Sequence, residues 1–165
     1  MARRSNRSLL ALTVFGLATA GAAWYGSQYS KGSRDPWYRH LDKPNFTPRD
    51  EVFPIVWTSL YILIAWSGWR VWSAAPSRNR RAALELWVSQ LIASAKWSKL
   101  FFGEHRLIAS VTDSVALQGT ILSYINAARK VDRSAAVAFI PYAAWVAYAT
   151  VLNAEIARRN LLRPA

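Results

Sequence analysis

The sequence predicts an all-α fold, an integral membrane bundle of five transmembrane helices. Three stretches contain no charged residue, 8–30, 52–69 and 134–154. Each is long enough to cross a bilayer, because a helix with a rise of 1.5 Å per residue needs about 20 apolar residues to span about 30 Å of hydrocarbon. Two further stretches, 81–103 and 107–128, have the length but carry charges. Nine Trp among 165 residues add to this prediction, since Trp is enriched at membrane interfaces.

The first helix is expected at about residues 9–27. Its Arg-rich start, apolar middle and small residues near the end also fit a cleaved signal peptide, and that alternative stays open. A long connector, residues 28–51, follows it. Pro36, Pro44 and Pro48 exclude a continuous helix there. A connector of this length in a compact protein is usually a lid, a binding segment or a disordered stretch.

The whole chain, 1–165, is predicted to form a single domain. The remaining helices are expected at about 52–73, 81–103, 107–128 and 134–158. A charge inside a bilayer costs about 2.5–3.5 kcal/mol. The charged residues of the third and fourth helices, 81–103 and 107–128, therefore need partners. The turn between these two helices is short, which predicts an antiparallel hairpin. Counting outward from that turn puts Lys96 level with Asp113, and we predict a structural ion pair between them. The alternative is that Lys96 reaches the interface alone.

The net charge of +12 does not by itself indicate a nucleic-acid partner. The Lys and Arg residues lie in short clusters between apolar stretches, a pattern typical of contact with anionic lipid headgroups. The chain has no Cys and only two His, which excludes Cys-based and three-His metal sites. No hydrolytic set of residues lies in a span, so no catalytic residue is assigned. The count of cations on the two sides is nearly equal and leaves the orientation open, with a slight preference for an inside N-terminus.

Aromatic residues recur at helical spacing. Trp57 and Tyr61 are four residues apart and share one helix face. In the last helix, Trp145, Ala149 and Asn153 follow one another at the same spacing. Such faces line concave apolar pockets for flat ligands, although aromatic pairs also simply fill helix interfaces.

The segment 52–61 is the most specific motif, and with Leu41-Asp42-Lys43-Pro44 before it the chain resembles the TspO/MBR family, also called translocator or tryptophan-rich sensory proteins. Residues 97–103 are similar to the family's W-S-P-L-F-F-G, and Asp113 to an acid early in its fourth helix. Residues 141–146 and 149–153 resemble P-Y-x-x-W and A-T-x-L-N of its fifth helix. The resemblance covers about residues 9–160.

This resemblance implies a multi-pass protein of the bacterial cell membrane, often a homodimer, with a pocket beneath the first loop. It implies binding of tetrapyrroles such as protoporphyrin IX, and a sensory, regulatory or transport role with a porphyrin as ligand and no required cofactor. The alternatives are light-dependent porphyrin degradation through Trp57 and Trp145, or a divergent scaffold without a ligand. Lys43 and Arg49 are the nearest cations for porphyrin carboxylates. The expected ligand-binding residues are Trp57, Tyr61, Ser94, Trp97, Phe102, Tyr142, Trp145, Ala149 and Asn153.

The sequence also departs from the family pattern. The W-x-P-P-x-W of the first loop is replaced by residues 45–51, which have lost two aromatic positions and gained acids. Ser94 occupies the position of an Asn in the family pattern, and Lys99 occupies the position of a proline. Ala154 occupies the Tyr position of a sterol-recognition pattern described in some relatives, so cholesterol binding is poorly supported.

Overall fold

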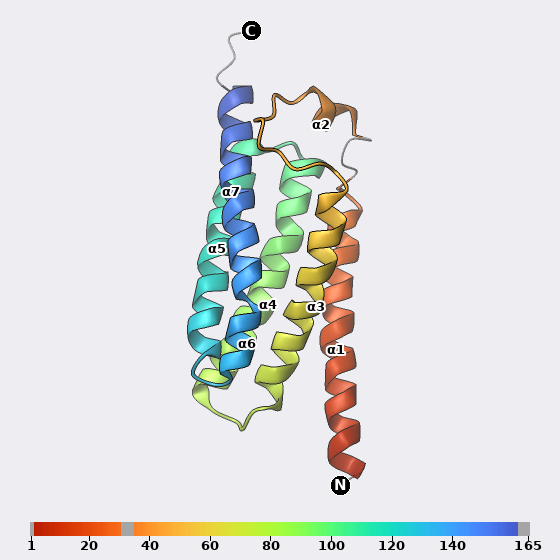
Figure 1. The fold of residues 1–165 in the computed structure, drawn as a ribbon, viewed down its shortest axis with the longest axis vertical. Helices are drawn as coiled ribbons and strands as arrows, with labels where there is room; N and C mark the ends of the chain where they lie inside the picture. Colours follow the sequence, from red (N-terminus) through yellow and green to blue (C-terminus); the bar gives the residue numbers. More distant parts are fainter. Residues whose placement is uncertain (1, 31–34, 162–165) are drawn as a thin grey trace.

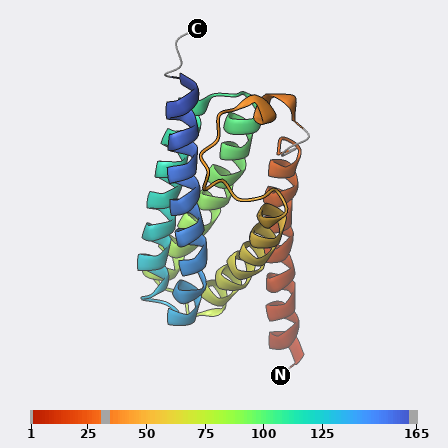
Figure 2. The same cartoon turned by 45° about the horizontal axis from the view of Figure 1, so that its top comes forward.

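The computed structural model describes residues 2–30 and 35–161, with side chains from Ser8 onward. Its elements are α1 (Ala2–Ser27), α2 (Pro36–His40), α3 (Val52–Ser73), α4 (Arg78–Ser98), the π-helical turn η2 (Lys99–Gly103), α5 (Leu107–Ala128), α6 (Arg133–Ala138) and α7 (Ile140–Leu161). All regular structure in these residues is helical, which confirms the predicted all-α class. The long helices run up and down beside one another, and α2 with its flanking loop crosses one end (Figures 1 and 2).

We call this end, with residues 35–51, the lid end, and we call residues 35–51 the lid. The opposite end, with connectors 74–77 and 129–132, is the base. The bounds of α3 and α5 are those predicted, 52–73 and 107–128. The first helix begins at Ala2 rather than near residue 9. The predicted connector 28–51 contains the short helix α2, and its residues 31–34 lie outside the described residues.

Two predicted helices have different limits. The helix expected at 81–103 begins at Arg78, because the Ser77 hydroxyl caps it by accepting from the Arg80 backbone N–H at 3.1 Å. Its last turn widens to η2, where the Glu104 N–H donates to the Lys99 carbonyl at 2.8 Å. The helix expected at 134–158 is divided into α6 and α7 at Phe139. Pro141 explains the break, since it lacks an N–H and crowds the preceding turn.

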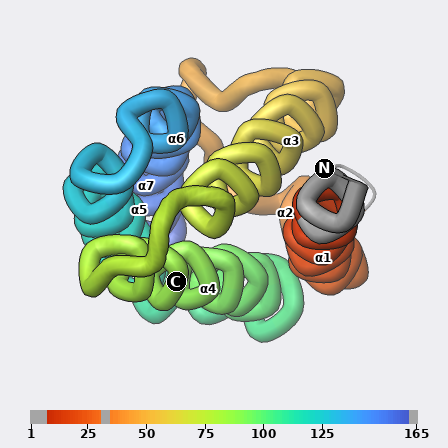
Figure 3. The backbone as a smooth tube through the Cα atoms, turned by 90° about the horizontal axis from the view of Figure 1, so that it is seen from below, coloured from red at the N-terminus to blue at the C-terminus, as the bar shows by residue number. Residues whose placement is uncertain are grey.

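Helix α1 packs along α3 and α4 at the edge of the bundle (Figure 3). The Phe15 ring meets the Trp87 ring edge-on, with centroids 4.7 Å apart. The Trp69 indole N–H donates to the Ser8 carbonyl at 3.1 Å. Gly68 allows the three helices to approach, because a Cβ there would lie 2.6 Å from both Phe15 and Trp87. In this structure α1 is therefore an integral part of the packing.

Several buried polar groups in the base half are hydrogen-bonded within the bundle. The Ser67 hydroxyl lies 2.6 Å from the Tyr124 hydroxyl and donates to the Ala135 carbonyl at 2.8 Å. The Trp87 indole N–H donates to the Ile64 carbonyl at 2.9 Å. These bonds join α3 to α4, α5 and α6. Polar groups in an apolar surrounding cannot bond to water, so they need partners within the protein.

Among the described residues, three helical segments are long and apolar enough to cross a membrane: Ser8–Ser27, Val52–Ser73 and Arg133–Leu161. Large apolar side chains also point outward along the bundle, where lipid would meet them. Examples with more than half of their surface exposed are Leu9, Leu17, Ile55, Ile62, Ile108 and Val151. This outward apolar surface is what an integral membrane protein needs.

Candidate functional site

The lid folds onto the bundle through aromatic contacts. Asp35 caps α2 by accepting from the Trp37 N–H at 2.9 Å. The Trp37 ring stacks on the His105 ring at 3.9 Å, nearly parallel, and His105 has a positive φ of 55° in the turn before α5. Tyr38 is buried against Phe102, with centroids 5.5 Å apart. Burial raises the pKa of the Tyr38 hydroxyl to about 12, so it stays neutral at ordinary pH.

The other edge of the lid is held by α7. The Asn160 side chain accepts from the Asp42 N–H at 2.9 Å and donates to the Asp42 carbonyl at 3.0 Å. The Tyr148 hydroxyl donates to the Phe46 carbonyl at 2.6 Å. Lys43, expected near a ligand carboxylate, instead donates to the Tyr38 carbonyl at 2.7 Å. The lid is therefore attached at several points rather than lying loosely on the bundle.

Replacing Asn160 with Ala should loosen the lid. The substitution removes both bonds to Asp42, and each is worth about 1 kcal/mol net, so the open population should rise roughly tenfold or more. Trypsin would then cleave at Arg39 or Arg49 correspondingly faster, as intact-mass analysis over time would show. Asn126→Ala, an exposed change near the base, is the matched control. Equal cleavage rates in the two variants would show that the amide does not hold the lid.

Beneath the lid, predicted residues of α3, α4 and α7 come together. The Trp57 ring stacks on Tyr61 at 5.4 Å and meets the edge of Tyr142 at 6.1 Å. Ser94 lies beside the hydroxyls of Tyr61 and Tyr142. Tyr142 is fully buried, and its hydroxyl has no partner of hydrogen-bond geometry in the described residues.

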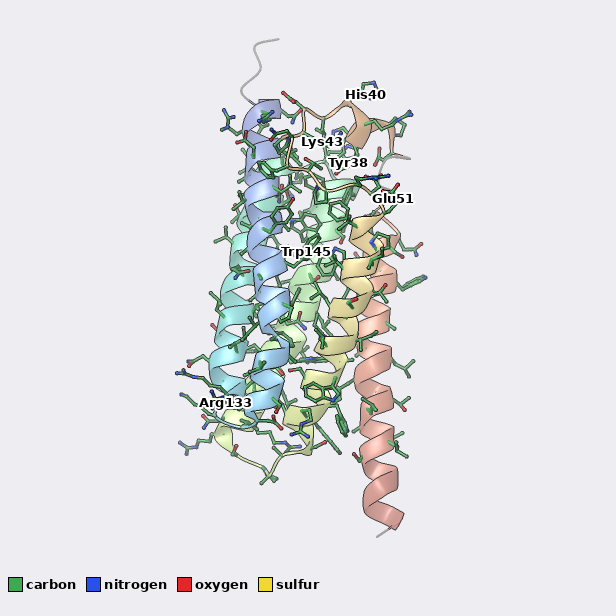
Figure 4. All side chains as sticks on the ribbon, in the orientation of Figure 1. Tyr38, His40, Lys43, Glu51, Arg133 and Trp145 are labelled. Atoms are coloured by element: carbon green, nitrogen blue, oxygen red, sulfur yellow. The ribbon has the colours of Figure 1, made fainter. Side chains whose placement is uncertain are left out.

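A second group of rings lies nearer the lid. Trp145 lies in the lid-side half of the bundle, below Tyr38 and Lys43 (Figure 4), and its ring meets the edge of Phe53 at 5.9 Å. Trp97 stacks on Phe101 at 5.4 Å, and Phe102 stands perpendicular to it at 5.9 Å. The rings pack on one another because each contact buries apolar area.

Three buried N–H groups at this site lack a partner among the described residues. They are the indole N–H of Trp97, the indole N–H of Trp145 and the side-chain amide N–H of Asn153. The Asn153 carbonyl oxygen lies 3.2 Å from the Ser110 hydroxyl, which also donates to the Leu107 carbonyl at 2.8 Å. Ala149, partly buried, lies one helical turn from both Trp145 and Asn153. Buried polar groups are normally paired, so these donors mark a place for hydrogen-bond acceptors.

The contact predicted between Lys96 and Asp113 is present. The Lys96 ammonium donates to Asp113 Oδ1 at 2.8 Å. The Asp113 side chain is 6% exposed and that of Lys96 is 61% exposed, so the carboxylate is the buried partner. The pair joins α4 to α5 about one turn before η2 begins at Lys99. Within the described residues, no group of three or more His, Asp or Glu side chains is arranged to hold a metal ion.

Comparison with known proteins now decides the family. The TspO/MBR family profile matches residues 12–159. The chain belongs to the TspO/MBR family. It is 34% identical to "Protein CrtK" of Rhodobacter capsulatus over 93% of this chain and 94% of that protein. It is 35% identical to the "Tryptophan-rich sensory protein" of Cereibacter sphaeroides over 79% of this chain and 80% of that protein. It is 30% identical to the human "Translocator protein" over 88% of each chain.

Membership in the TspO/MBR family, together with the apolar helices, identifies a membrane protein. Sequence reasoning missed several residues of this candidate site. Phe53 lies four residues before Trp57, and Phe101 four residues after Trp97, so helical spacing would have found both. Ser110 and Asn160 gave no such signal, because their partners lie 43 and 118 residues away along the chain.

Proposed function

We propose that this protein binds a tetrapyrrole such as protoporphyrin IX, or a similarly flat apolar ligand, between α3, α4, α5 and α7 under the lid. The role would be sensory or regulatory in tetrapyrrole metabolism, or transport. The observation that carries this proposal is the set of unpartnered donors on Trp97, Trp145 and Asn153, surrounded by aromatic rings. A flat macrocycle with acceptor groups matches both properties, since rings stack on its faces and donors meet its edge.

Ligand entry would require movement in this proposal. The rings of Trp57, Tyr61 and Tyr142 contact one another, and the lid crosses the end of the bundle nearest to them (Figure 2). A macrocycle would enter when the lid lifts, and the rings would part around it. Arg49, paired with Glu51 at 3.5 Å on the exposed lid surface, could reach a ligand carboxylate only after such movement.

The membrane arrangement is part of the same proposal. We infer that α1, α3, α4 with η2, α5, and α6 with α7 cross the membrane as five spans of a multi-pass protein. The two less apolar helices, α4 and α5, would be tolerated because the Lys96–Asp113 pair neutralises their innermost charges. The bacterial relatives support residence in a bacterial cell membrane, and a homodimer is the expected assembly.

Titration of the purified full chain with protoporphyrin IX in the dark tests the binding proposal. Tryptophan fluorescence should be quenched saturably. Trp145→Phe keeps the ring but removes one donor, so affinity should fall roughly threefold to tenfold. Trp24→Phe, on the exposed outer side of α1, is the control and should leave affinity unchanged. Absence of saturable quenching, or an equal loss in both variants, would overturn the proposal and leave the scaffold alternative.

Illumination of the same samples separates binding from porphyrin breakdown. The stacked Trp57 and Tyr61 rings, in edge contact with Tyr142, are the observation that favours a photochemical role. A new pigment formed only in light, and lost when Trp57 and Trp145 are both changed to Phe, would establish degradation. Saturable binding without a new pigment supports the sensory or transport role.

A further inference from the structure

Charge is distributed unequally between the two ends of the bundle. Among the described side chains, the base carries seven cations and two acids: Arg70, Arg78, Arg80, Arg81, Arg129, Lys130 and Arg133, with Glu85 and Asp132. The lid end also carries seven cations, but six acids accompany them: Arg39, Lys43, Arg49, Lys99, Arg106, Arg158 and Arg159, with Asp35, Asp42, Asp50, Glu51, Glu104 and Glu155. Arg133 marks the base in Figure 4, opposite Glu51 and His40. The base is therefore the strongly cationic end.

A surface groove at the base combines these cations with apolar side chains. It lies along the first three turns of α4, and its lining includes Arg78, Arg80, Arg81, Leu84, Glu85 and Val88. Arg81 pairs with Glu85 at 2.9 Å, whereas Arg78 is exposed and has no ion-pair partner in the described part of the chain. Val88 leaves 49% of its surface exposed two turns further along the helix. The groove is thus basic at one end and apolar at the other.

Trp residues give the depth of this groove in a membrane. Trp66, Trp69 and Trp72 lie in the last two turns of α3, at the base. Trp side chains gather at the headgroup level of bilayers. Arg80, in the first turn of α4, donates to the Trp72 carbonyl at 3.0 Å, with its guanidinium 5.9 Å from the Trp72 ring. The arginines therefore lie at headgroup level, and Leu84 and Val88 extend toward the acyl chains.

We propose that this groove binds an anionic phospholipid, with its phosphate at Arg78 and Arg81 and one acyl chain along Leu84 and Val88. A free phosphate would use only the basic half of the groove. The site is distinct from the aromatic site, which lies at the lid end. Because anionic lipid attracts juxtamembrane cations on the cytoplasmic side, the proposal also places the base toward the cytoplasm.

Native mass spectrometry of the full chain, titrated with dioleoyl phosphatidylglycerol or dioleoyl phosphatidylcholine, tests this proposal. The wild type should retain phosphatidylglycerol in preference to phosphatidylcholine. Arg78→Gln with Arg81→Gln should lower the affinity for phosphatidylglycerol roughly tenfold or more. Glu85→Gln should act in the opposite direction, because it removes the acid that competes for Arg81. Arg49→Gln with Arg106→Gln removes two charges at the lid end and is the matched control.

Three outcomes would overturn the proposal. One is an equal loss in the control, which would mean that net charge alone attracts the lipid. Another is that the wild type retains phosphatidylcholine as well as it retains phosphatidylglycerol, which would show that the arginines do not select the lipid by its charge. The third is displacement of phosphatidylglycerol by inorganic phosphate, which would indicate an anion site without a chain-binding half. Protoporphyrin titration of the base variants, Arg78→Gln with Arg81→Gln and Glu85→Gln, should be unchanged, so failure here is distinguishable from failure of the ligand proposal.

Discussion

Replacing Lys96 with Met should destabilise the protein by about 3 kcal/mol or more, the largest effect we expect from a single substitution. The change leaves the Asp113 carboxylate buried, with Oδ1 deprived of its ammonium partner and Oδ2 already unpartnered in the described residues. Removing one member of a buried ion pair is costly because the remaining charge stays in a low-dielectric surrounding. Thermal unfolding in detergent micelles, followed by tryptophan fluorescence, measures the loss.

The two partners should not respond alike. Asp113→Asn should cost less than Lys96→Met, because the Lys96 side chain is 61% exposed and can extend its ammonium toward the headgroups. Lys99→Met is the matched control, since Lys99 pairs with Glu104 at 3.4 Å near the surface. The exchange Lys96→Asp with Asp113→Lys should recover part of the stability. If Lys96→Met melts no lower than Lys99→Met, the pair is not what stabilises the contact between α4 and α5.

Gly68→Ala should destabilise the protein by about 1–3 kcal/mol, although Ala is the better helix former. The added Cβ would lie 2.6 Å from the Trp87 indole nitrogen and 2.6 Å from Phe15. Both rings are large and packed, so the overlap must be relieved by moving α1 or α4 away from α3. The shift would also strain the bond from the Trp87 N–H to the Ile64 carbonyl. The same melting experiment in micelles measures the effect.

Gly119→Ala is the control, and it should change the stability in the opposite direction. Gly119 lies within α5, and a Cβ there would meet no described atom within 4 Å. Helix propensity alone then applies, so this variant should be more stable by roughly 0.5–1 kcal/mol. Equal melting temperatures for the two variants would mean that the junction of α1, α3 and α4 adapts to the extra methyl group without cost.

Much of this fold follows from fixed helical geometry. The rise per residue and the short turn at 104–106 were enough to match Lys96 with Asp113. The bounds of α3 and α5 were predictable because charged or turn residues end both apolar stretches sharply. The start of α4 and the break at Phe139 were missed, since they depend on the Ser77 cap and on Pro141 rather than on hydropathy.

The residues of α3, α4 and α7 at the candidate site were predictable from the sequence, but the attachment of the lid was not. Trp57, Ser94 and Tyr142 share their helix faces with apolar neighbours, and helical spacing predicts which residues point inward. The attachment of the lid depends on single pairs such as Asp42 with Asn160, which are 118 residues apart. No local pattern encodes such a contact, because either residue would fit equally well on an exposed loop or helix end. The same holds for the stacking of Trp37 on His105.

The amide bonds between Asp42 and Asn160 also have a consequence for biosynthesis. The lid lies in the first third of the chain, whereas Asn160 lies in the last turn of α7, which is made after all the other helices of the bundle. Before α7 is made, the lid can be held only by contacts outside α7, such as those with Phe102 and His105. The edge of the lid that faces α7 therefore stays unattached through most of synthesis, and it is attached only when the last helix packs against α5.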